Sequence, residues 1–325
     1  MLDGQGREIN YLRISVTDRC NLRCQYCMPE NGISHVGHKD ILSLEEIARL
    51  VRVGASIGIR KIRLTGGEPL VRRNISQLVH YINDIKEIDD IALTTNGILF
   101  APQANELRAA GLKRVNFSLD SMVAEKYRYI TRSGDLSVVL DSIEKALALE
   151  LHPIKINTVI IKGFNDDEIM DFVDMAFKYP LHIRFIEFMP IGDLLFWKKD
   201  RLMTSEEIKQ RIEQKYVLEP AKIEGSGPAS YFKIDGGTGS VGFISPMSNH
   251  FCARCNRIRM TAEGKLRACL YEQGETDLKP ALKRSSDDEE LRQLFIATLD
   301  AKPMQHHMQS GWGEDNHRKM YQIGG

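Results

Sequence analysis

The feature that most constrains the fold is a regular alternation of β-branched segments with amphipathic segments between residue 11 and about residue 190. The former are typical of strands, and the latter place apolar residues at helical spacing. Ser43 and Glu46 form a capping box at the start of one expected helix. Strands are expected at residues 11–17, 61–66, 91–96, 114–120, 154–161 and 182–188. Helices are expected at residues 43–58, 74–85, 102–111, 135–150 and 166–178. This alternation predicts right-handed βαβ units with parallel strands.

Six such units predict an α/β fold, either a doubly wound sheet or an incomplete TIM-like barrel, two units short of the closed eightfold form. We favour the incomplete six-unit barrel, because polar or glycine-rich residues follow each strand and could share one site. The pattern changes after Gly192, so we expect a first domain at 1–192 and a smaller C-terminal α+β domain at 193–325. Within the second domain, we expect helices at 204–216 and 283–299, and strands joined by a glycine-rich turn within 222–246.

The charge balance argues against partners with strongly charged surfaces. The 325 residues include 44 basic and 44 acidic side chains, so the formal net charge is zero. A chain of this kind has no general attraction for nucleic acid or for an acidic membrane. No apolar run approaches the roughly 20 residues of a membrane span, and the N-terminal segment lacks the apolar core of a signal peptide. We therefore expect a cytoplasmic protein whose cysteines stay reduced.

All six cysteines fall into two groups of three. The first triad is Cys20, Cys24 and Cys27, and the second triad is Cys252, Cys255 and Cys269. An odd number of cysteines in each group argues against local disulfide pairs, so metal binding is the favoured interpretation of both.

The first triad follows the first expected strand directly, in a βα loop. That end of parallel strands carries the active site in barrels and open sheets alike. Structural zinc sites need four ligands, usually as paired C-x2-C units, whereas C-x3-C-x2-C offers three. Three thiolates would leave one iron of a four-iron cluster open to bind and activate a small molecule. We favour an iron–sulfur cluster over zinc or unliganded thiols.

The second triad has the spacing C-x2-C-x13-C, and His250 lies two residues upstream. A Cys3His zinc site and a second open cluster fit this spacing equally well, and the first triad shifts the balance toward the cluster. Arg257 and Arg259 lie between the thiols, and in an extended segment they point to the same side. Paired guanidinium groups suit a polyphosphate, and the chain has no Walker-type phosphate loop.

The C-x3-C-x2-C spacing, with the aromatic Tyr26 before its last cysteine, resembles the signature of radical S-adenosylmethionine enzymes. LTGGEP at 64–69 is similar to that family's contact to the amino group of S-adenosyl-L-methionine, where Glu68 offers an acceptor. The resemblance implies a partial barrel of six βα units and a [4Fe–4S] cluster on the first triad, whose open iron binds the cofactor. One electron from the cluster would cleave the cofactor to a 5′-deoxyadenosyl radical. The implied cofactor contacts are Tyr26, Gly67, Ser118 and Met189.

Over essentially its whole length, the chain is similar to those members of the family that cyclise GTP in the first step of molybdenum cofactor biosynthesis. The residues that carry this similarity are C-x2-C-x13-C, the NRIR segment and the terminal Gly-Gly. It implies a second [4Fe–4S] cluster in 193–325, with its open iron at the guanine base. The radical would take hydrogen from C3′ of GTP, and the C3′ radical would then attack C8. Reduction and protonation would give the cyclised nucleotide. The implied GTP site is Arg13, Arg63, Thr94, Lys155, Arg257, Ile258 and Arg259, and the implied catalytic tail is Gly324 and Gly325.

The resemblance also implies an electron donor of flavodoxin or ferredoxin type and a downstream cyclic pyranopterin monophosphate synthase, and it allows a homodimer. Two alternatives stay open: a peptide-modifying radical enzyme with an auxiliary cluster, and a zinc-stabilised binding module without enzymatic activity. Residues 191–203 and 225–237 receive no role. His306, His307 and His317 are expected to be surface or structural histidines.

Overall fold

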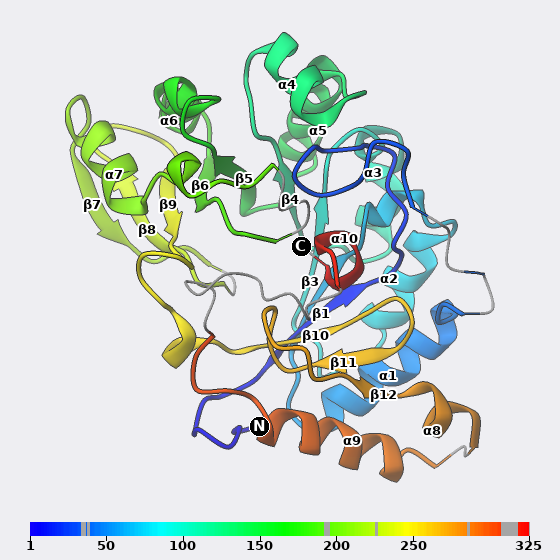
Figure 1. Cartoon of the computed structure of the whole chain (residues 1–325). Coiled ribbons are helices and arrows are strands. Elements are labelled where there is room, and N and C mark those ends of the chain that lie inside the picture. Colours follow the sequence, from blue (N-terminus) through cyan, green and yellow to red (C-terminus); the bar gives the residue numbers. More distant parts are fainter. Residues whose placement is uncertain are drawn as a thin grey trace.

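The computed structural model describes residues 1–33, 37, 40–191, 196–224, 227–284, 287–306 and 318–324. In this part of the chain one sheet runs through the molecule in the order β12-β11-β10-β1-β2-β3-β4-β5-β6-β9-β8-β7 (Figure 1). The strands are β1 (Tyr11–Ser15), β2 (Lys61–Thr65), β3 (Asp90–Thr95), β4 (Arg114–Ser118), β5 (Ile154–Ile160), β6 (Leu181–Glu187), β7 (Leu218–Ala221), β8 (Ser230–Ile234), β9 (Ser240–Ile244), β10 (Arg257–Met260), β11 (Lys265–Arg267) and β12 (Thr276–Asp277). The helices are α1 (Leu44–Ser56), α2 (Ile75–Asn83), α3 (Phe100–Ala109), α4 (Ala124–Thr131), α5 (Leu136–Ala148), α6 (Ile169–Lys178), α7 (Ser205–Glu213), α8 (Lys279–Arg284), α9 (Glu289–Asp300) and α10 (Met320–Ile323).

The strands β1 to β6 are parallel neighbours in chain order, and the sheet ends at β12 and β7 without closing. This confirms the predicted α/β fold with an incomplete six-unit barrel. Every expected strand of the barrel is present, and the expected capping box at Ser43 forms. A further capping box is found at Thr204. The helix α4 was not expected. It buries only Tyr127, Ile130 and Thr131, so its sequence shows too narrow an apolar stripe.

Strands of the C-terminal part extend this same sheet at both of its edges. β10 pairs in parallel with β1, and β9 pairs in parallel with β6. The antiparallel strands β11 and β12 then follow at one edge, and β8 and β7 at the other. Both ends of the barrel sheet are therefore continued by residues from beyond the six βα units.

The two faces of the barrel sheet have opposite character. Leu12 and Ile14 of β1 belong to the apolar core under the helices. The alternate residues Tyr11 and Arg13 line the cavity on the inner face. Because side chains alternate along a strand, this period-two pattern gives the barrel an apolar outside layer and a polar interior. None of the described helices is long and apolar enough to cross a membrane.

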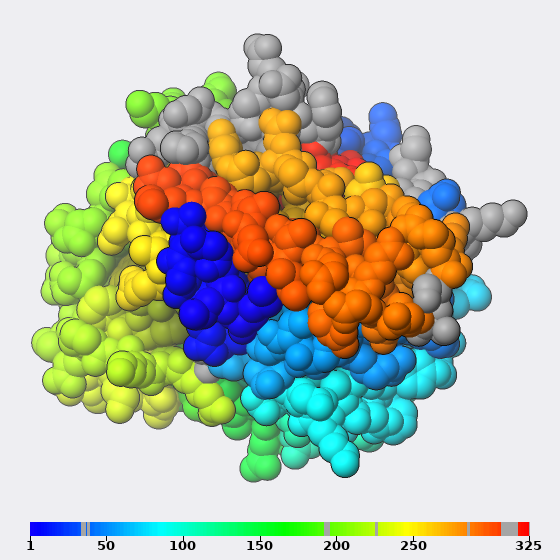
Figure 2. Space-filling view, turned by 90° about the horizontal axis from the view of Figure 1, so that it is seen from below, coloured from blue at the N-terminus to red at the C-terminus, as the bar shows by residue number. Residues whose placement is uncertain are grey.

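The N-terminal segment packs beside the chain that follows α9, as seen from below in Figure 2. Arg7 is held by Asp3, with its Nε 2.7 Å from the carboxylate. It donates to the carbonyl oxygens of Cys252 (3.0 Å) and Pro303 (2.8 Å). The first residues of the chain thereby fix the loop that carries the second triad.

Candidate active site

The first triad lies in the loop after β1, and α4 holds this loop in place. The Gln25 N–H donates to the Ile130 carbonyl oxygen at 2.9 Å, near the end of α4. Arg132, just beyond α4, donates from Nη1 to the carbonyl oxygen of Arg23 at 2.7 Å. These bonds fix the segment between the first two cysteines and the segment just after the second. The thiols therefore depend on a helix that is far away in sequence for their position.

The thiols of the first triad lie in buried surroundings that disfavour the thiolate form. The Leu22 N–H lies 3.4 Å from Cys20 Sγ, and the backbone of Tyr321 donates to Cys27. Burial raises the pKa of Cys20 to about 11 and that of Cys27 to about 12. Burial, together with the nearby Cys27, raises the pKa of Cys24 well above its usual value. Thiols with such raised pKa values become thiolates only beside a cation, and the irons of a cluster supply that charge.

The glycine-rich turn after β2 packs against the loop of the first triad. A Cβ atom at Gly67 would lie 2.3 Å from the carbonyl oxygen of Arg19, so only glycine allows this approach. The Glu68 carboxylate accepts the Asn96 N–H at 2.7 Å and the Thr95 hydroxyl at 2.7 Å. Each of its oxygens thus accepts a hydrogen bond within the protein, and Glu68 helps to hold the turn.

Tyr26 is fixed by a buried carboxylate. Its hydroxyl donates to Asp120 Oδ2 at 2.6 Å, and the Val159 N–H donates to Oδ1 at 2.9 Å. Burial raises the pKa of Asp120 to about 6. The Tyr26 ring packs edge-on against Phe188, with 6.2 Å between ring centroids. Asp120 was not identified from the sequence, although it lies two residues beyond Ser118 at the end of β4.

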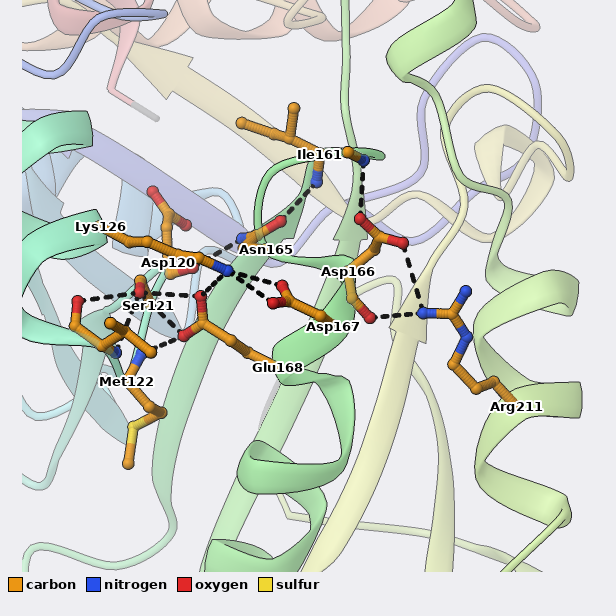
Figure 3. Close-up of polar contacts among 12 residues, drawn as sticks. Asp120, Ser121, Met122, Lys126, Ile161, Asn165, Asp166, Asp167, Glu168 and Arg211 are labelled. Carbon is orange, nitrogen blue, oxygen red and sulfur yellow. Dashed lines mark hydrogen bonds and ion pairs between the residues drawn. The ribbon is translucent and has the colours of Figure 1, made fainter.

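Figure 3 shows the polar network that supports this region. Asn165 Nδ2 donates to the Asp120 carbonyl oxygen at 2.6 Å. The buried Glu168 accepts the Ser121 hydroxyl at 2.8 Å and the Met122 N–H at 2.6 Å. These bonds fix the chain where α4 begins. Because the other end of α4 holds the first triad, the network sets the position of the thiols at a distance.

The second triad lines a cavity on the inner face of the barrel. Cys252 and Cys255 precede β10, and Cys269 follows β11, so the β10–β11 hairpin brings the three cysteines together. Other residues that line this cavity are Arg13, Arg63, Arg184, Arg257, Arg259 and Met189. None of the described residues that line it is acidic. The cavity therefore combines three soft ligands with unbalanced positive charge.

The second triad has cationic neighbours. Burial alone would raise the pKa of Cys255, but Arg257 and Lys302 outweigh it and lower that pKa to about 6. Lys302 is buried and donates to the Arg257 carbonyl oxygen at 2.8 Å. These cations favour the thiolate form of Cys255, which is the form that binds a metal.

Two histidines also approach the second triad. His250 Nδ1 and His306 Nε2 lie 3.3 Å apart, and the ligand atoms of both histidines and Cys252 are within 4.8 Å of one another. His306 was expected to be a surface or a structural histidine. It is buried and lines the cavity, so it is not a surface residue. His307 and His317 lie outside the described residues.

The pKa values of residues that line the cavity indicate an anion site. Burial, followed by neighbouring guanidinium groups, lowers the pKa of Arg13 to about 9. Arg63 and Arg13 outweigh burial and lower the pKa of Tyr11 to about 8, and Arg63 Nε donates to the Tyr11 hydroxyl. Several guanidinium groups and no described acidic residue line this cavity, so a multiply charged anion is the ligand that it fits best.

Not every expected GTP contact faces this cavity. Lys155 lines a second hollow instead and donates to the Glu224 carbonyl oxygen at 2.7 Å. Thr94 accepts from Arg63 Nη1 at 3.2 Å. The side chain of Ile258 is fully buried in the apolar core, so only its backbone could contact a ligand. Arg184 lines the cavity but was not identified from the sequence.

The C-terminal tail enters the same region. α10 lies inside the open side of the barrel (Figure 1). Arg259 donates to the carbonyl oxygens of Ile323 (3.1 Å) and Gly324. Gly324 has φ +73, and a Cβ there would lie 2.7 Å from Thr65 Cγ2. Gly324 therefore has both the conformation and the clearance that need glycine. Gly325 lies outside the described residues.

Two protein-family models match the chain in succession. The Radical SAM superfamily matches residues 14–176, and Molybdenum Cofactor Synthesis C matches residues 181–308. A protein named GTP 3′,8-cyclase from Syntrophomonas wolfei is 67% identical, with 100% of both chains covered. One of the same name from Moorella thermoacetica is 54% identical, again with 100% of both chains covered.

A solved structure shares the fold. The crystal structure of Streptococcus suis SuiB bound to the precursor peptide SuiA covers 90% of this chain and 67% of that chain, with a TM-score of 0.61. The sequence identity is 14%, so this likeness concerns the architecture alone.

Proposed function

The chain belongs to the GTP 3′,8-cyclase family of radical S-adenosylmethionine enzymes, and we propose that it converts GTP to (8S)-3′,8-cyclo-7,8-dihydroguanosine 5′-triphosphate. This reaction is the first step of molybdenum cofactor biosynthesis. The observation that carries the proposal is the cavity in which the second triad and buried arginines share one wall. Neither a peptide-modifying enzyme nor a zinc-stabilised binding module accounts for both the cationic wall and the family match.

The first triad would hold a [4Fe–4S] cluster. When bound there, S-adenosyl-L-methionine supplies, on one-electron reduction, the carbon radical that removes hydrogen from the substrate. Tyr26, Gly67, Ser118 and Met189 would contact that cofactor. Of these, Met189 also lines the cavity of the second triad, which supports a shared boundary between cofactor and substrate.

The second triad would hold another [4Fe–4S] cluster, with the guanine base at its open iron. The low pKa of Cys255 supports metal ligation at this place. Arg13, Arg63, Arg257 and Arg259 would bind the triphosphate, because guanidinium groups match phosphate oxygens in charge and geometry. Thr94 and the backbone of Ile258 would complete the site, together with Lys155, whose hollow shares Gly227 with this cavity.

The protein's own share of the reaction is to orient the substrate and to exclude water. Arg259 already holds the tail through the carbonyl oxygens of Ile323 and Gly324, and the tail backbone also reaches Cys27. We propose that Gly324 and Gly325 act as a catalytic tail between the two cofactor sites. A substrate that is held in this way reacts in an effectively unimolecular step, which lowers the entropic part of the activation barrier.

The chemistry also defines partners. One-electron reduction requires an electron donor, which we propose is of flavodoxin or ferredoxin type. We propose that a cyclic pyranopterin monophosphate synthase consumes the cyclised nucleotide. A homodimer in the cytoplasm is the form in which we propose that the enzyme acts.

An anaerobic assay with GTP, S-adenosyl-L-methionine and a reductant tests the activity, with the cyclised nucleotide measured by mass spectrometry. Protein that carries both clusters should contain roughly eight iron and eight acid-labile sulfide per chain. Stoichiometric zinc without labile sulfide, or loaded protein that forms no cyclised product, would contradict the proposal.

A further inference from the structure

Strand register arranges the inward side chains of the barrel in rows. In one row, Ser118 of β4 pairs with Asn157 of β5, which pairs with Arg184 of β6. In the next row toward the N-terminal ends of these strands, Asn116 pairs with Lys155. Asn157 therefore lies between a proposed contact of S-adenosyl-L-methionine and a buried guanidinium group of the cavity.

Both asparagines belong to the cavity wall, and each has a buried acceptor. Asn116 and Asn157 line it, and the Oδ1 atom of each is buried without a hydrogen-bond partner among the described residues. Only 1% of Asn116 is exposed. A buried amide oxygen without a partner is destabilising. Two such oxygens in one cavity wall therefore indicate a ligand that donates hydrogen bonds.

The neighbouring polar groups in this cavity are hydrogen-bond donors instead of acceptors. Arg63 Nη2 and Arg184 Nε are buried donors without partners in the described part of the chain. These donors suit phosphate oxygens, which only accept. In a nucleoside triphosphate, the sugar hydroxyls lie between the base and the phosphates, and they donate. Acceptors placed among cations thus match a sugar joined to a phosphate chain.

We infer that Asn157, together with Asn116, accepts hydrogen bonds from the ribose hydroxyls of the nucleotide and selects a ribonucleotide over a deoxyribonucleotide. The inference rests on the proposed function, because it takes this cavity as the nucleotide site. The position also suits the reaction. A sugar held at the level of Ser118 lies on the cofactor side of the cavity, where its C3′ hydrogen must be removed.

The test measures binding without turnover. Protein loaded with both clusters is dialysed anaerobically against GTP or 2′,3′-dideoxyGTP, in the absence of S-adenosyl-L-methionine. The unaltered protein should bind GTP about tenfold more tightly than the dideoxy nucleotide, since a buried acceptor is left unpaired by the latter. In Asn157→Ala this preference should fall below about threefold, mainly through weaker GTP binding. Asn157→Asp keeps an oxygen acceptor and should retain the preference despite weaker binding of both nucleotides.

Asn83→Ala, on the exposed side of α2, is the matched control and should leave both affinities unchanged. If Asn157→Ala loses cluster iron, Asn157→Ser gives the same comparison, because its shorter side chain cannot reach the same hydroxyl. Equal binding of the two nucleotides by the unaltered protein would overturn the inference but leave the proposed function standing. An unchanged preference in the Asn116→Ala, Asn157→Ala double variant would also overturn it. Failure of the loaded, unaltered protein to bind GTP at all would instead overturn the proposed function.

Discussion

The two cysteine triads have equal numbers of thiols and opposite electrostatic surroundings. Near the first, Asp120 contributes negative charge and helps to raise the pKa of Cys24, after burial and Cys27. Near the second, Arg257 and Lys302 lower the pKa of Cys255 to about 6. The contrast matches the proposed ligands, a sulfonium cation at the first triad and a polyanionic nucleotide at the second. Similar ligand sets can thus serve different tasks when the charge around them differs.

The largest effect is expected from removing one thiol of either triad. Cys24→Ala should abolish reductive cleavage of S-adenosyl-L-methionine, because the first cluster would lose a ligand. Cys255→Ala should abolish GTP binding yet keep cofactor cleavage. Formation of 5′-deoxyadenosine and dialysis with GTP measure the two losses, and iron should fall from roughly eight to four per chain in each variant. Cofactor cleavage by the Cys24→Ala protein would refute the assignment of cofactor cleavage to the first triad and of GTP binding to the second.

Arg257→Ala should weaken GTP binding by about 10- to 100-fold, the usual loss for a hydrogen bond to a charged group. Cofactor cleavage without GTP should survive, since this residue belongs to the second region only. Iron content must be measured alongside, because Arg257 also stabilises the Cys255 thiolate. Unchanged GTP affinity in protein with full iron content would contradict the polyphosphate role of the NRIR segment.

Asp120→Asn makes the corresponding change in the first region. Loss of a buried negative charge should raise the reduction potential of the first cluster, on the order of 100 mV. Affinity for S-adenosyl-L-methionine should fall by about tenfold, because its cation loses an attractive neighbour. GTP affinity should not change. Potentiometric titration followed by electron paramagnetic resonance measures the shift, and Tyr26→Phe, which keeps the carboxylate, is the control. An equal shift in both variants would assign the effect to the hydrogen bond instead of the charge.

Lys155 predicts how GTP binding depends on pH. Burial, with nearby Arg184 and Arg114, lowers its pKa to about 6 in the nucleotide-free protein. A bound polyanion raises that pKa, so above pH 6 binding takes up a proton. Affinity should therefore fall as pH rises, by up to about tenfold per unit. Lys155→Arg keeps its charge and should show a flatter profile between pH 6 and 8. Parallel profiles for the two proteins would remove Lys155 from the site.

The smallest effect is expected at the tail, which touches both regions. In Gly324→Ala, the new Cβ would approach Thr65 Cγ2 to 2.7 Å at a left-handed φ. Cyclisation should fall severalfold, about 1 kcal/mol in barrier, while both clusters and both ligand affinities are retained. Full activity would show that the tail has no catalytic role.

The sequence predicted the barrel well because its strands and helices have strong periodic patterns. It missed α4, whose apolar stripe is narrow, and the continuation of the sheet through β9 and β10. The pairing of β10 with β1 joins segments that are separated by most of the chain, and no local sequence pattern encodes it.

The cysteine triads were evident from spacing alone, whereas Arg184, Asn116 and Asn157 were not. Each of these three occupies an inward position of a predicted strand, two residues from another polar residue on the same face. Arg13, Arg63 and Lys155 were expected from the family resemblance, whereas the period-two alternation of side chains along a strand would have pointed to these three. Asp120 had no such signal, because its role depends on contacts with Tyr26 and Val159 that only the folded chain brings together.

The pairing of β1 with β10 has a consequence for how the molecule is made. During synthesis β1 emerges early, and its β2 edge is paired soon afterwards, but its other edge waits until residue 257 has been translated. Long-range parallel pairing is slow, and an unpaired edge strand is a template for aggregation. A fragment that stops before β10 would keep this edge open beside the first triad. Chaperone protection during translation would then matter most for the part of the enzyme that was made first.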